Sequence, residues 1–288
     1  MLANSLGTKG LVVGGAAAEP VVSERAASGL ESASDKESLL PGQCERLDYA
    51  DRWMRSGVEA CAIPGFFWTV EANMDGARNR MDEARARGER VTVTGLVVHA
   101  VARALDRYPA MQRLMSNARR CRPGRINVAV SVSGGGCDFV APVAIVKDAA
   151  RRTPSEITAD IARQADQARA TQLRAMHAFR KWGWLIPFAT LRRLAMRRFF
   201  ARELWKNPND TPLFHVTGTG DMDLAMPMIL LTPGILGVGQ MKEKAVVVNG
   251  KVKAGWRMAL SGGFDHRVWV GQSAAQFLTE VKRILEDM

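Results

Sequence analysis

Four strand-like segments follow one another near the C-terminal end of the chain, and this run constrains the fold more than any other feature. The segments lie at 212–218, 228–239, 244–249 and 253–260. Asn249-Gly250, between the last two segments, favours a tight hairpin turn. A run of strands that is separated from paired helices is typical of an α/β sandwich with a mixed sheet.

The helical segments lie mainly before this run, and one helix follows it. Thr153-Pro154-Ser155-Glu156 is the strongest helix start, because Thr caps the first turn, Pro suits the first helical position and Glu completes a capping box. That helix is predicted to run to about Met176. The other expected elements are helices over 46–60, 74–87, 94–108 and 273–286, strands over 66–74, 126–133 and 139–146, and a turn over 134–136. This order predicts a two-layer sandwich in which helices cover a mixed β-sheet.

Composition limits the class of protein. The chain has 288 residues, of which 47% are hydrophobic and 24% charged, as in a globular protein that builds a single core. The cysteines form no CxxC pair and the histidines no HExxH motif, so we expect no metal site. Gly218-Thr219-Gly220 lacks the third glycine and the following helix of a dinucleotide-binding motif. The formal net charge of +11 favours an anionic partner, but without a nucleic-acid-binding module we expect no nucleic acid.

The N-terminal part differs from the rest. Residues 1–45 are rich in Gly, Ala, Ser and Glu without a helical or strand period, so we expect a flexible leader there and one folded domain over 46–288. The N-terminus lacks the pattern of a secretory signal. No stretch of the sequence reaches the roughly 18 apolar residues of a membrane span. We therefore expect a cytoplasmic protein without membrane contact.

The C-terminal segment carries the most specific motif. It reads Ser261-Gly262-Gly263-Phe264-Asp265-His266-Arg267-Val268-Trp269-Val270-Gly271. This resembles the DHRxxDG signature of dihydrolipoyl acyltransferases, the catalytic cores of 2-oxoacid dehydrogenase complexes, and the related HHxxxDG of chloramphenicol acetyltransferases. The resemblance covers about 46–170 and 210–288, with further matches at 63–75, 231–239 and 246–250. It implies the chloramphenicol acetyltransferase-like fold and an acyltransferase that uses coenzyme A.

The resemblance implies roles for individual residues. His266 would be the general base that deprotonates a thiol, whose thiolate attacks a thioester carbonyl. An imidazole suits this task, because a thiol with a pKa near 8.5 is mostly protonated at neutral pH. Thr217 aligns with the serine of the family's FTxSxxG strand, and its hydroxyl would stabilise the oxyanion, although strands favour Thr for its shape alone. We expect His215 to lie on the opposite face from Thr217, as a structural residue or a pocket wall.

The sequence departs from the family at one position of the motif. The aspartate that follows the family histidine by four residues is Val270 here. In the family this aspartate pairs with an arginine of the first helix, which aligns with Arg55, and fixes the active-site loop. We expect Arg55 to have found another partner, such as Asp51 or Asp265. The site-organising residues that remain are Arg55, Asp265, Arg267 and Gly271.

The resemblance also implies an assembly. Family members form trimers in which the histidine and the hydroxyl donor meet across a subunit interface, so a homotrimer with sites at its interfaces is expected. Residues 1–45 show no lipoyl-lysine hairpin, and we therefore expect no covalent lipoyl group in this chain and a free-standing enzyme.

Residues of about 176–208 form an insertion relative to the family, and arginines and aromatic residues are frequent in it. It is open whether the insertion is a hairpin lid near the acyl pocket or acceptor entrance, a packed surface insertion, or a docking surface for a membrane or an acidic partner. On a helical wheel, Arg198 and Arg202 fall inside the apolar stripe through Leu191, Ala195 and Trp205. This pattern argues against a helix that lies on a membrane.

Three functions follow from these observations. The main prediction is a CoA-dependent acyltransferase that moves an acyl group between a thioester and a thiol, hydroxyl or amine acceptor. Val270 motivates an alternative, a catalytically inactive family member that serves as a trimeric scaffold or binding module. A third interpretation is a transferase whose acceptor is bound to an acidic acyl carrier protein, which the basic insertion would dock.

Overall fold

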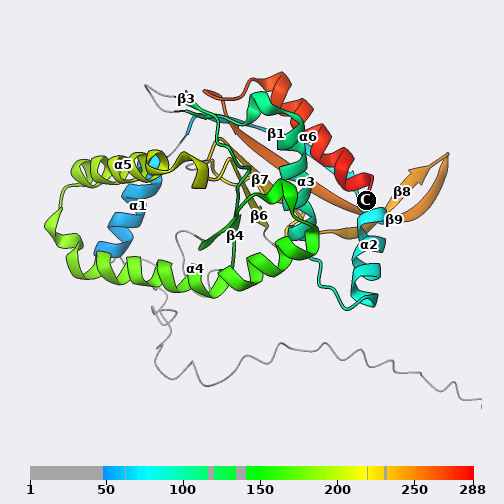
Figure 1. Ribbon diagram of the computed structural model, residues 1–288, viewed down its shortest axis with the longest axis horizontal. Coiled ribbons are helices and arrows are strands. Elements are labelled where there is room, and N and C mark those ends of the chain that lie inside the picture. Colours follow the sequence, from blue (N-terminus) through cyan, green and yellow to red (C-terminus); the bar gives the residue numbers. More distant parts are fainter. Residues whose placement is uncertain (1–47, 62, 116–119, 134–140, 219, 230–231) are drawn as a thin grey trace, which may run out of the picture. The chain divides into compact units, whose positions relative to one another are not determined.

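A seven-stranded mixed β-sheet forms the centre of the fold (Figure 1). The computed structural model describes residues 48–61, 63–115, 120–133, 141–218, 220–229 and 232–288. The strands follow the order β1-β9-β7-β6-β4-β5, and β8 pairs with β9 outside this path. Their bounds are β1 Gly65–Asn73, β4 Val128–Ser131, β5 Val143–Val146, β6 Phe214–Gly218, β7 Gly234–Val238, β8 Lys242–Val248 and β9 Lys251–Asp265. The neighbours β4, β6 and β7 run parallel, whereas β1, β7 and β8 pair with β9, and β5 with β4, in antiparallel fashion.

Short elements connect these strands. A two-stranded sheet consists of β2 Leu114–Met115 and β3 Arg120–Cys121. Single turns of 3-10 helix are η2 Pro109–Met111, η3 Ala149–Arg151, η4 Gly183–Leu185 and η5 Pro208–Asp210. The expected leader over 1–45, the turn over 134–136 and the first two residues of the expected strand over 139–146 lie outside the described residues.

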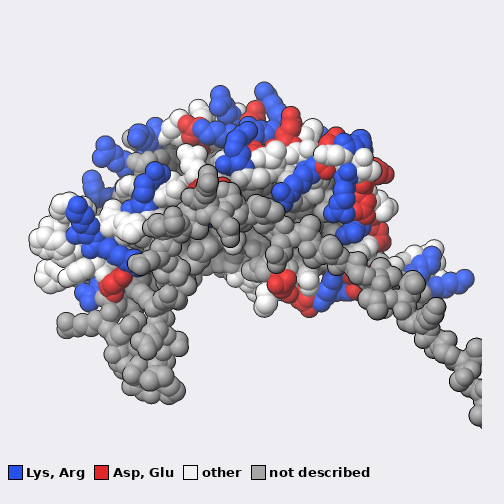
Figure 2. All heavy atoms as spheres, turned by 90° about the horizontal axis from the view of Figure 1, so that it is seen from below, with Lys and Arg blue, Asp and Glu red and all other residues white. Residues whose placement is uncertain are grey.

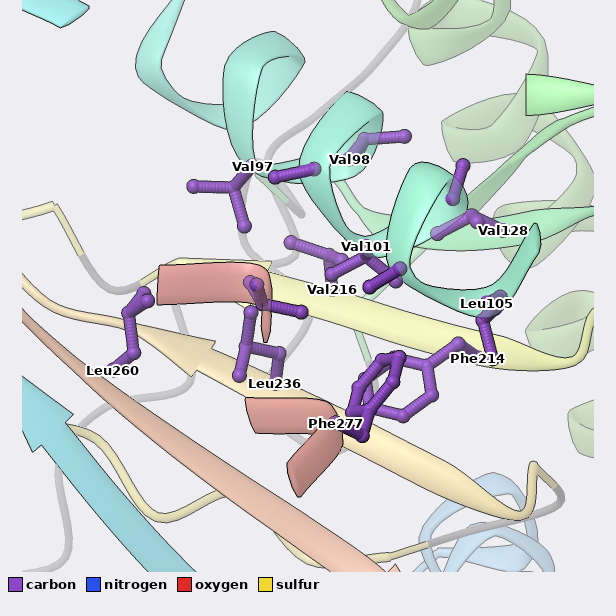
Figure 3. Packing of buried hydrophobic residues seen from close by; sticks show 14 of the residues in the cluster. Val97, Val98, Val101, Leu105, Val128, Phe214, Val216, Leu236, Leu260 and Phe277 are labelled. Atoms are coloured by element: carbon purple, nitrogen blue, oxygen red, sulfur yellow. The ribbon is translucent and has the colours of Figure 1, made fainter. Parts of the chain in front are cut away.

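The hydrophobic core lies between one face of the sheet and three helices, α2 Asp75–Ala86, α3 Val93–Arg107 and α6 Gly271–Glu286. Figure 3 shows the side chains that meet there: Val97, Val98, Val101 and Leu105 of α3, Val128 of β4, Phe214 and Val216 of β6, Leu236 of β7, Leu260 of β9 and Phe277 of α6. Burying each such side chain stabilises the fold by about 1.5–3 kcal/mol. The fold class predicted from the sequence, a mixed sheet covered by helices, is therefore confirmed.

The structure confirms the helix start and the hairpin turn that were predicted from residues close together in the sequence. Helix α4 begins at Pro154, and the Thr153–Glu156 capping box is complete, with both reciprocal hydrogen bonds present. Asn249 and Gly250 have φ angles of 51° and 75°, as the two central positions of a type I′ hairpin turn require. Helix α3 begins slightly earlier than expected, because the Thr92 hydroxyl accepts the backbone N–H of Gly95 at 3.1 Å.

Strand β9 is longer than predicted. The sequence pattern indicated an end at residue 260, but the strand continues through the glycines to Asp265. Here β9 lies between β1 and β7 and pairs with both, so hydrogen bonding on both sides outweighs the weak strand propensity of Gly262 and Gly263. A Cβ at Gly263 would approach Phe67 to 2.6 Å, which explains why a residue without a side chain stands there.

The expected insertion folds as a helical hairpin. Helix α4 (Pro154–Trp182) continues past Met176, and after η4 the chain returns as α5 (Ala189–Lys206). Both helices contact α1 (Tyr49–Cys61), and Figure 1 shows the three helices side by side. The rings of Trp53 and Phe179 stack with centroids 5.2 Å apart, and the Trp53 indole donates a hydrogen bond of 3.0 Å to the Gly183 carbonyl. We call α1, the C-terminal part of α4, η4 and α5 the three-helix unit.

Candidate active site

His266 lies in the turn that follows β9, with its side chain exposed. Its backbone N–H donates a hydrogen bond of 3.1 Å to the carbonyl of Pro64, just before β1. The imidazole packs edge-on against Phe66, with ring centroids 5.0 Å apart. The pairing of β1 with β9 brings these two segments together, since Gly65 stands opposite Asp265. The imidazole is therefore positioned by β1 and accessible to a substrate.

Asp265 and Arg267 flank the histidine and bind each other. The Asp265 side chain is 5% exposed and accepts charge-assisted hydrogen bonds from the Arg267 guanidinium, of 2.9 Å from Nε and 2.8 Å from Nη2. The same carboxylate accepts the Arg267 backbone N–H at 3.0 Å. The pairing raises the pKa of the Arg267 guanidinium above its usual value, mainly through the hydrogen bonds to Asp265. Because the Asp265–Arg267 ion pair spans His266, it fixes the backbone on both sides of the histidine.

Trp269 anchors the other end of the turn. Its ring is buried in an aromatic cluster, 5.1 Å from Phe264, 5.2 Å from Phe277 and 6.2 Å from Phe214 between centroids. Its backbone N–H donates a hydrogen bond of 2.9 Å to the Asp265 carbonyl. Because Trp269 is part of the core, the His266 turn is tied to the packing of α6 and the sheet.

Val270 and Gly271 come where the turn joins α6. Val270 is the N-cap residue of α6, in extended conformation, and its side chain is 62% exposed. Gly271 is the first residue of the helix. The Asp265 carboxylate, one of the expected partners of Arg55, accepts hydrogen bonds from Arg267. Arg55 belongs to α1, and the side chains of Arg55 and Asp51 lie outside the described part of the chain.

Thr217 is near the C-terminal end of β6, half-buried. It stands opposite Gly237 of β7, which in turn stands opposite Ser261 of β9. Asp265 is four residues beyond Ser261 along β9. At ~3.3 Å per residue, Asp265 therefore lies roughly 13 Å along the strand direction from the level of Ser261 and Thr217. The structure therefore does not bring Thr217 and His266 together within one chain.

His215 shares a face of β6 with Thr217, and the expectation that it points to the opposite face is wrong. Residues two apart on a strand lie on the same side, and Phe214 and Val216 are the ones buried in the core. The His215 ring lies 2.8 Å from the Ser131 hydroxyl of β4, measured from Nε2 to Oγ. Burial lowers the pKa of His215 to about 4, so the ring is neutral at neutral pH. Ser131, His215 and Thr217 thus form a polar row on the sheet face opposite the core.

The sequence pattern did not indicate Ser131 or Ser261 as site residues. Ser261 is fully buried, and its hydroxyl has no hydrogen-bond partner among the residues that the structure describes. Beside it, a Cβ on Gly237 would come within 2.1 Å of the Ala225 carbonyl, so the segment near Ala225 covers this part of the sheet. Knowledge of which strands are neighbours is needed to see that these hydroxyls lie near Thr217.

Two further features concern cofactors and membranes. Among the described residues, no group of three or more His, Cys, Asp or Glu side chains is arranged to hold a metal ion. In the same part of the chain, no helix combines the length and hydropathy needed to cross a membrane.

The sequence matches the profile of a family described as 2-oxoacid dehydrogenases acyltransferase (catalytic domain), over residues 54–178 and 212–288. Residues 179–211, which contain η4 and α5, lie between the two matched stretches.

Relatives and solved structures agree with this match. The dihydrolipoyllysine-residue succinyltransferase component of the 2-oxoglutarate dehydrogenase complex of Bartonella vinsonii subsp. berkhoffii is 26% identical over 69% of this chain and 41% of its own length. The lipoamide acyltransferase component of the branched-chain alpha-keto acid dehydrogenase complex of Bacillus subtilis is 25% identical over 94% of this chain and 57% of its own length. The chain thus spans about half the length of these relatives. A truncated catalytic core of the 2-oxoacid dehydrogenase multienzyme complex from Thermoplasma acidophilum has the same fold, with a TM-score of 0.62 and 22% identity over 85% of this chain and 98% of that one.

Proposed function

Because the chain belongs to the family of 2-oxoacid dehydrogenase acyltransferase catalytic domains, we propose that it transfers acyl groups to or from coenzyme A with His266 as general base. The placement of His266 carries this proposal: its imidazole is exposed in a turn whose backbone is fixed by the Asp265–Arg267 pair and by Trp269. A base held in this way can approach a substrate thiol without rearrangement of the fold. The acceptor is a thiol, hydroxyl or amine.

The proposed reaction needs a proton acceptor and an oxyanion donor. A CoA or acceptor thiol is mostly protonated at neutral pH, so removal of its proton by His266 generates the nucleophilic thiolate. The thiolate adds to the thioester carbonyl, and the Thr217 hydroxyl donates a hydrogen bond to the resulting oxyanion. Collapse of the tetrahedral intermediate expels the other thiolate, which takes the proton back from His266.

We further propose that a complete site requires a second copy of the chain. His266 and Thr217 lie about four residues apart along the strand direction and on strands separated by β7, which supports a site assembled from two subunits of a homotrimer. In such an assembly the two residues of one chain would serve two different sites. The trimer, the cytoplasmic location and the absence of a lipoyl group remain predictions.

The three-helix unit is proposed to border the acceptor entrance. Helix α1 ends at Cys61, three residues before Pro64, whose carbonyl accepts the hydrogen bond from His266. At the turn between α4 and α5 the side chains of Trp182, Trp184 and Phe188 are 56%, 55% and 65% exposed. The three-helix unit lies at the left in Figures 1 and 2. On the face shown in Figure 2, Lys and Arg side chains and uncharged residues dominate that left end, with few acidic side chains. These features support a lid or an entrance for an acidic carrier more than an inert insertion.

One observation favours the alternative, a catalytically inactive scaffold. Val270 replaces the family's acidic residue, and its exposed side chain provides no charge to hold an arginine of a neighbouring element. The Asp265–Arg267 pair retains the geometry of the turn without that residue, and we therefore propose the active enzyme.

Thiol-exchange assays with acetyl-CoA and short thiol acceptors test the proposal. We expect His266→Ala to slow turnover by at least about 100-fold, the lower range for loss of a general base. His177→Ala is the matched control for loss of a histidine, because His177 is exposed on the C-terminal part of α4 and has no role in the proposed proton transfer. Thr217→Val should lower kcat by about 100-fold with little change in KM. Equal turnover by wild type and His266→Ala would sink the proposal, and a folded wild type without turnover on any thioester would favour the scaffold.

A further inference from the structure

A large cavity lies on the helical side of the molecule, away from the residues of the candidate site. It has a volume of about 960 Å³ and is lined by α2, α3, the segment that leads into β4 and the start of α4. Neither His266 nor Thr217 lines it. The volume lies in the range of pockets that hold ligands of nucleotide size.

Arginines dominate the wall of this cavity. Six of them line it, against two aspartates, Asp106 and Asp148: Arg80, Arg103, Arg122, Arg125, Arg151 and Arg152. Three are already paired: Arg152 binds the buried Asp160 carboxylate, which does not line the cavity, Arg151 lies 3.8 Å from Asp148, and Arg122 donates a hydrogen bond of 3.0 Å to Gln112. With Asp160 counted, the formal surplus is three positive charges around one concavity.

Three of these guanidinium groups are unneutralised. Arg80 of α2, Arg103 of α3 and Arg125 before β4 form no hydrogen bond or ion pair with any residue that the structure describes. They come from three separate elements, so the fold and not the local sequence brings them together. All three are exposed on the wall of the cavity, where an anion that bridges them would gain charge-assisted hydrogen bonds.

Two other groups in the cavity wall, His99 and the N-terminus of α4, are related to the positive potential of the arginines. The pKa of His99 is lowered, mainly by burial and further by Arg103 and Arg80, while its Nδ1 lies 2.9 Å from the Arg152 carbonyl. The N-terminus of the 29-residue helix α4 also borders the cavity, at Thr153 and Pro154, and contributes the positive end of its dipole. The cavity thus combines arginine side chains, which bind phosphate oxygens in bidentate fashion, with a helix N-terminus.

From this arrangement we infer that the cavity binds a small molecule that carries two or more linked phosphate groups. One phosphate would leave some of the three unneutralised arginines without a partner, whereas a di- or triphosphate spans several of them. A bounded concavity suits a compact ligand better than a nucleic-acid strand, which needs a continuous groove. The ligand source is either a nucleoside polyphosphate or an inorganic polyphosphate, which share the linked phosphates.

Titration calorimetry with inorganic tripolyphosphate, ATP and adenosine tests this inference on the full chain. Tripolyphosphate and ATP should both bind, and adenosine should not. If ATP binds at least about tenfold more tightly than tripolyphosphate, the base contributes and the ligand is a nucleotide; equal affinities indicate that the phosphates alone are recognised. Failure of both phosphate probes to bind overturns the inference.

Paired variants separate a built site from general attraction by a basic protein. Arg103→Gln/Arg125→Gln should weaken tripolyphosphate binding by at least about tenfold, because charge-assisted hydrogen bonds are lost. Lys251→Gln/Lys253→Gln removes the same charge from the exposed β8–β9 hairpin and should change binding by less than about twofold. Equal weakening by both double variants would show non-specific attraction, as would tighter binding of a single-stranded oligonucleotide that both variants weaken alike. Thermal melts without ligand verify that both double variants are folded.

Discussion

The sheet with its three covering helices and the three-helix unit are stabilised in different ways. The core beneath the sheet is apolar and extends through α2, α3, α6 and six strands of the sheet. The three-helix unit depends on a few large or polar contacts, the stack of Trp53 on Phe179 and the buried Arg192, which donates hydrogen bonds to Ser56 and to the Ile186 carbonyl. Its apolar side chains at the α4–α5 turn are exposed.

This difference indicates where the molecule tolerates change. The His266 turn is attached to the apolar core through Trp269, so its geometry is as stable as the core. The three-helix unit joins that core through α1 and the first half of α4, and its polar contacts allow it to open locally without global unfolding. A rigid His266 turn together with a helical unit that opens locally would suit the proposed transfer of acyl groups to large acceptors.

The largest expected loss of stability follows from a change in the core beneath the sheet. Trp269→Ala should lower the free energy of unfolding by about 3–5 kcal/mol, because it leaves a cavity within the aromatic cluster. Trp269→Phe is the control, since the buried indole N–H has no hydrogen-bond partner in the described part of the chain. We expect this variant to lose less than about 1.5 kcal/mol. Urea melts measure both, and similar losses in the two variants would contradict the assigned role of packing.

The second effect is the pH dependence that His215 introduces. Its pKa is about 4 in the folded chain and about 6.5 when unfolded, so the unfolded state binds more protons between these values. The resulting stability is fully present above about pH 6.5 and is lost as the pH falls toward 4, by about 3 kcal/mol. His215→Asn should flatten that part of the stability curve. If the wild type and His215→Asn show the same dependence of unfolding free energy on pH between 6.5 and 5, the neutral, buried state of this ring is contradicted.

A third, smaller effect is expected in the three-helix unit. Arg192→Met removes a buried guanidinium whose partners Ser56 and the Ile186 carbonyl then lack their donor, at a cost of about 2 kcal/mol. Hydrogen exchange should speed up in α1 and α5 but not in α3. Arg197→Met, at an exposed position of α5, serves as control. Equal acceleration in α3 would show that the two regions unfold as one.

Val270→Asp should have the smallest effect, and a stabilising one. Val270 is the exposed N-cap of α6, so a carboxylate at this position stays solvated and needs no arginine partner. Aspartate is among the best N-cap residues and valine among the poorest, so we expect a gain of about 1 kcal/mol. Val270→Ala, which cannot cap, should gain nothing. A loss of stability in the aspartate variant would show that a second copy covers this position.

The elements that the sequence located correctly are those set by neighbouring residues. The Thr153–Glu156 capping box and the Asn249-Gly250 turn involve partners within three positions, and both occur as predicted. The extension of β9 to Asp265 could not be predicted, because pairing with β1 and β7 decides it. The continuation of α4 past Met176 likewise depends on α1, whose Trp53 stacks on Phe179.

The candidate site follows the same rule. His266, Asp265 and Arg267 are adjacent in the chain and were found through one motif. The contact between Ser131 and His215 joins residues 84 positions apart and depends on the parallel pairing of β4 with β6. The cavity arginines Arg80, Arg103 and Arg125 come from α2, α3 and the segment before β4, and nothing in the sequence around each of them distinguishes it from an ordinary exposed arginine. The sequence alone does not show which residues from distant parts of the chain come together in the fold.

Mixing two inactive variants tests the central claim, acyl transfer at a site shared between chains, most directly. His266→Ala and Thr217→Val chains are unfolded together, refolded as an equal mixture, and assayed for thiol exchange with acetyl-CoA. If one chain supplies His266 and another Thr217, about a quarter of the sites in a randomly mixed trimer contain both native residues, and activity should rise to about that fraction of wild type. A mixture that is no more active than the average of the two separate variants would contradict the account.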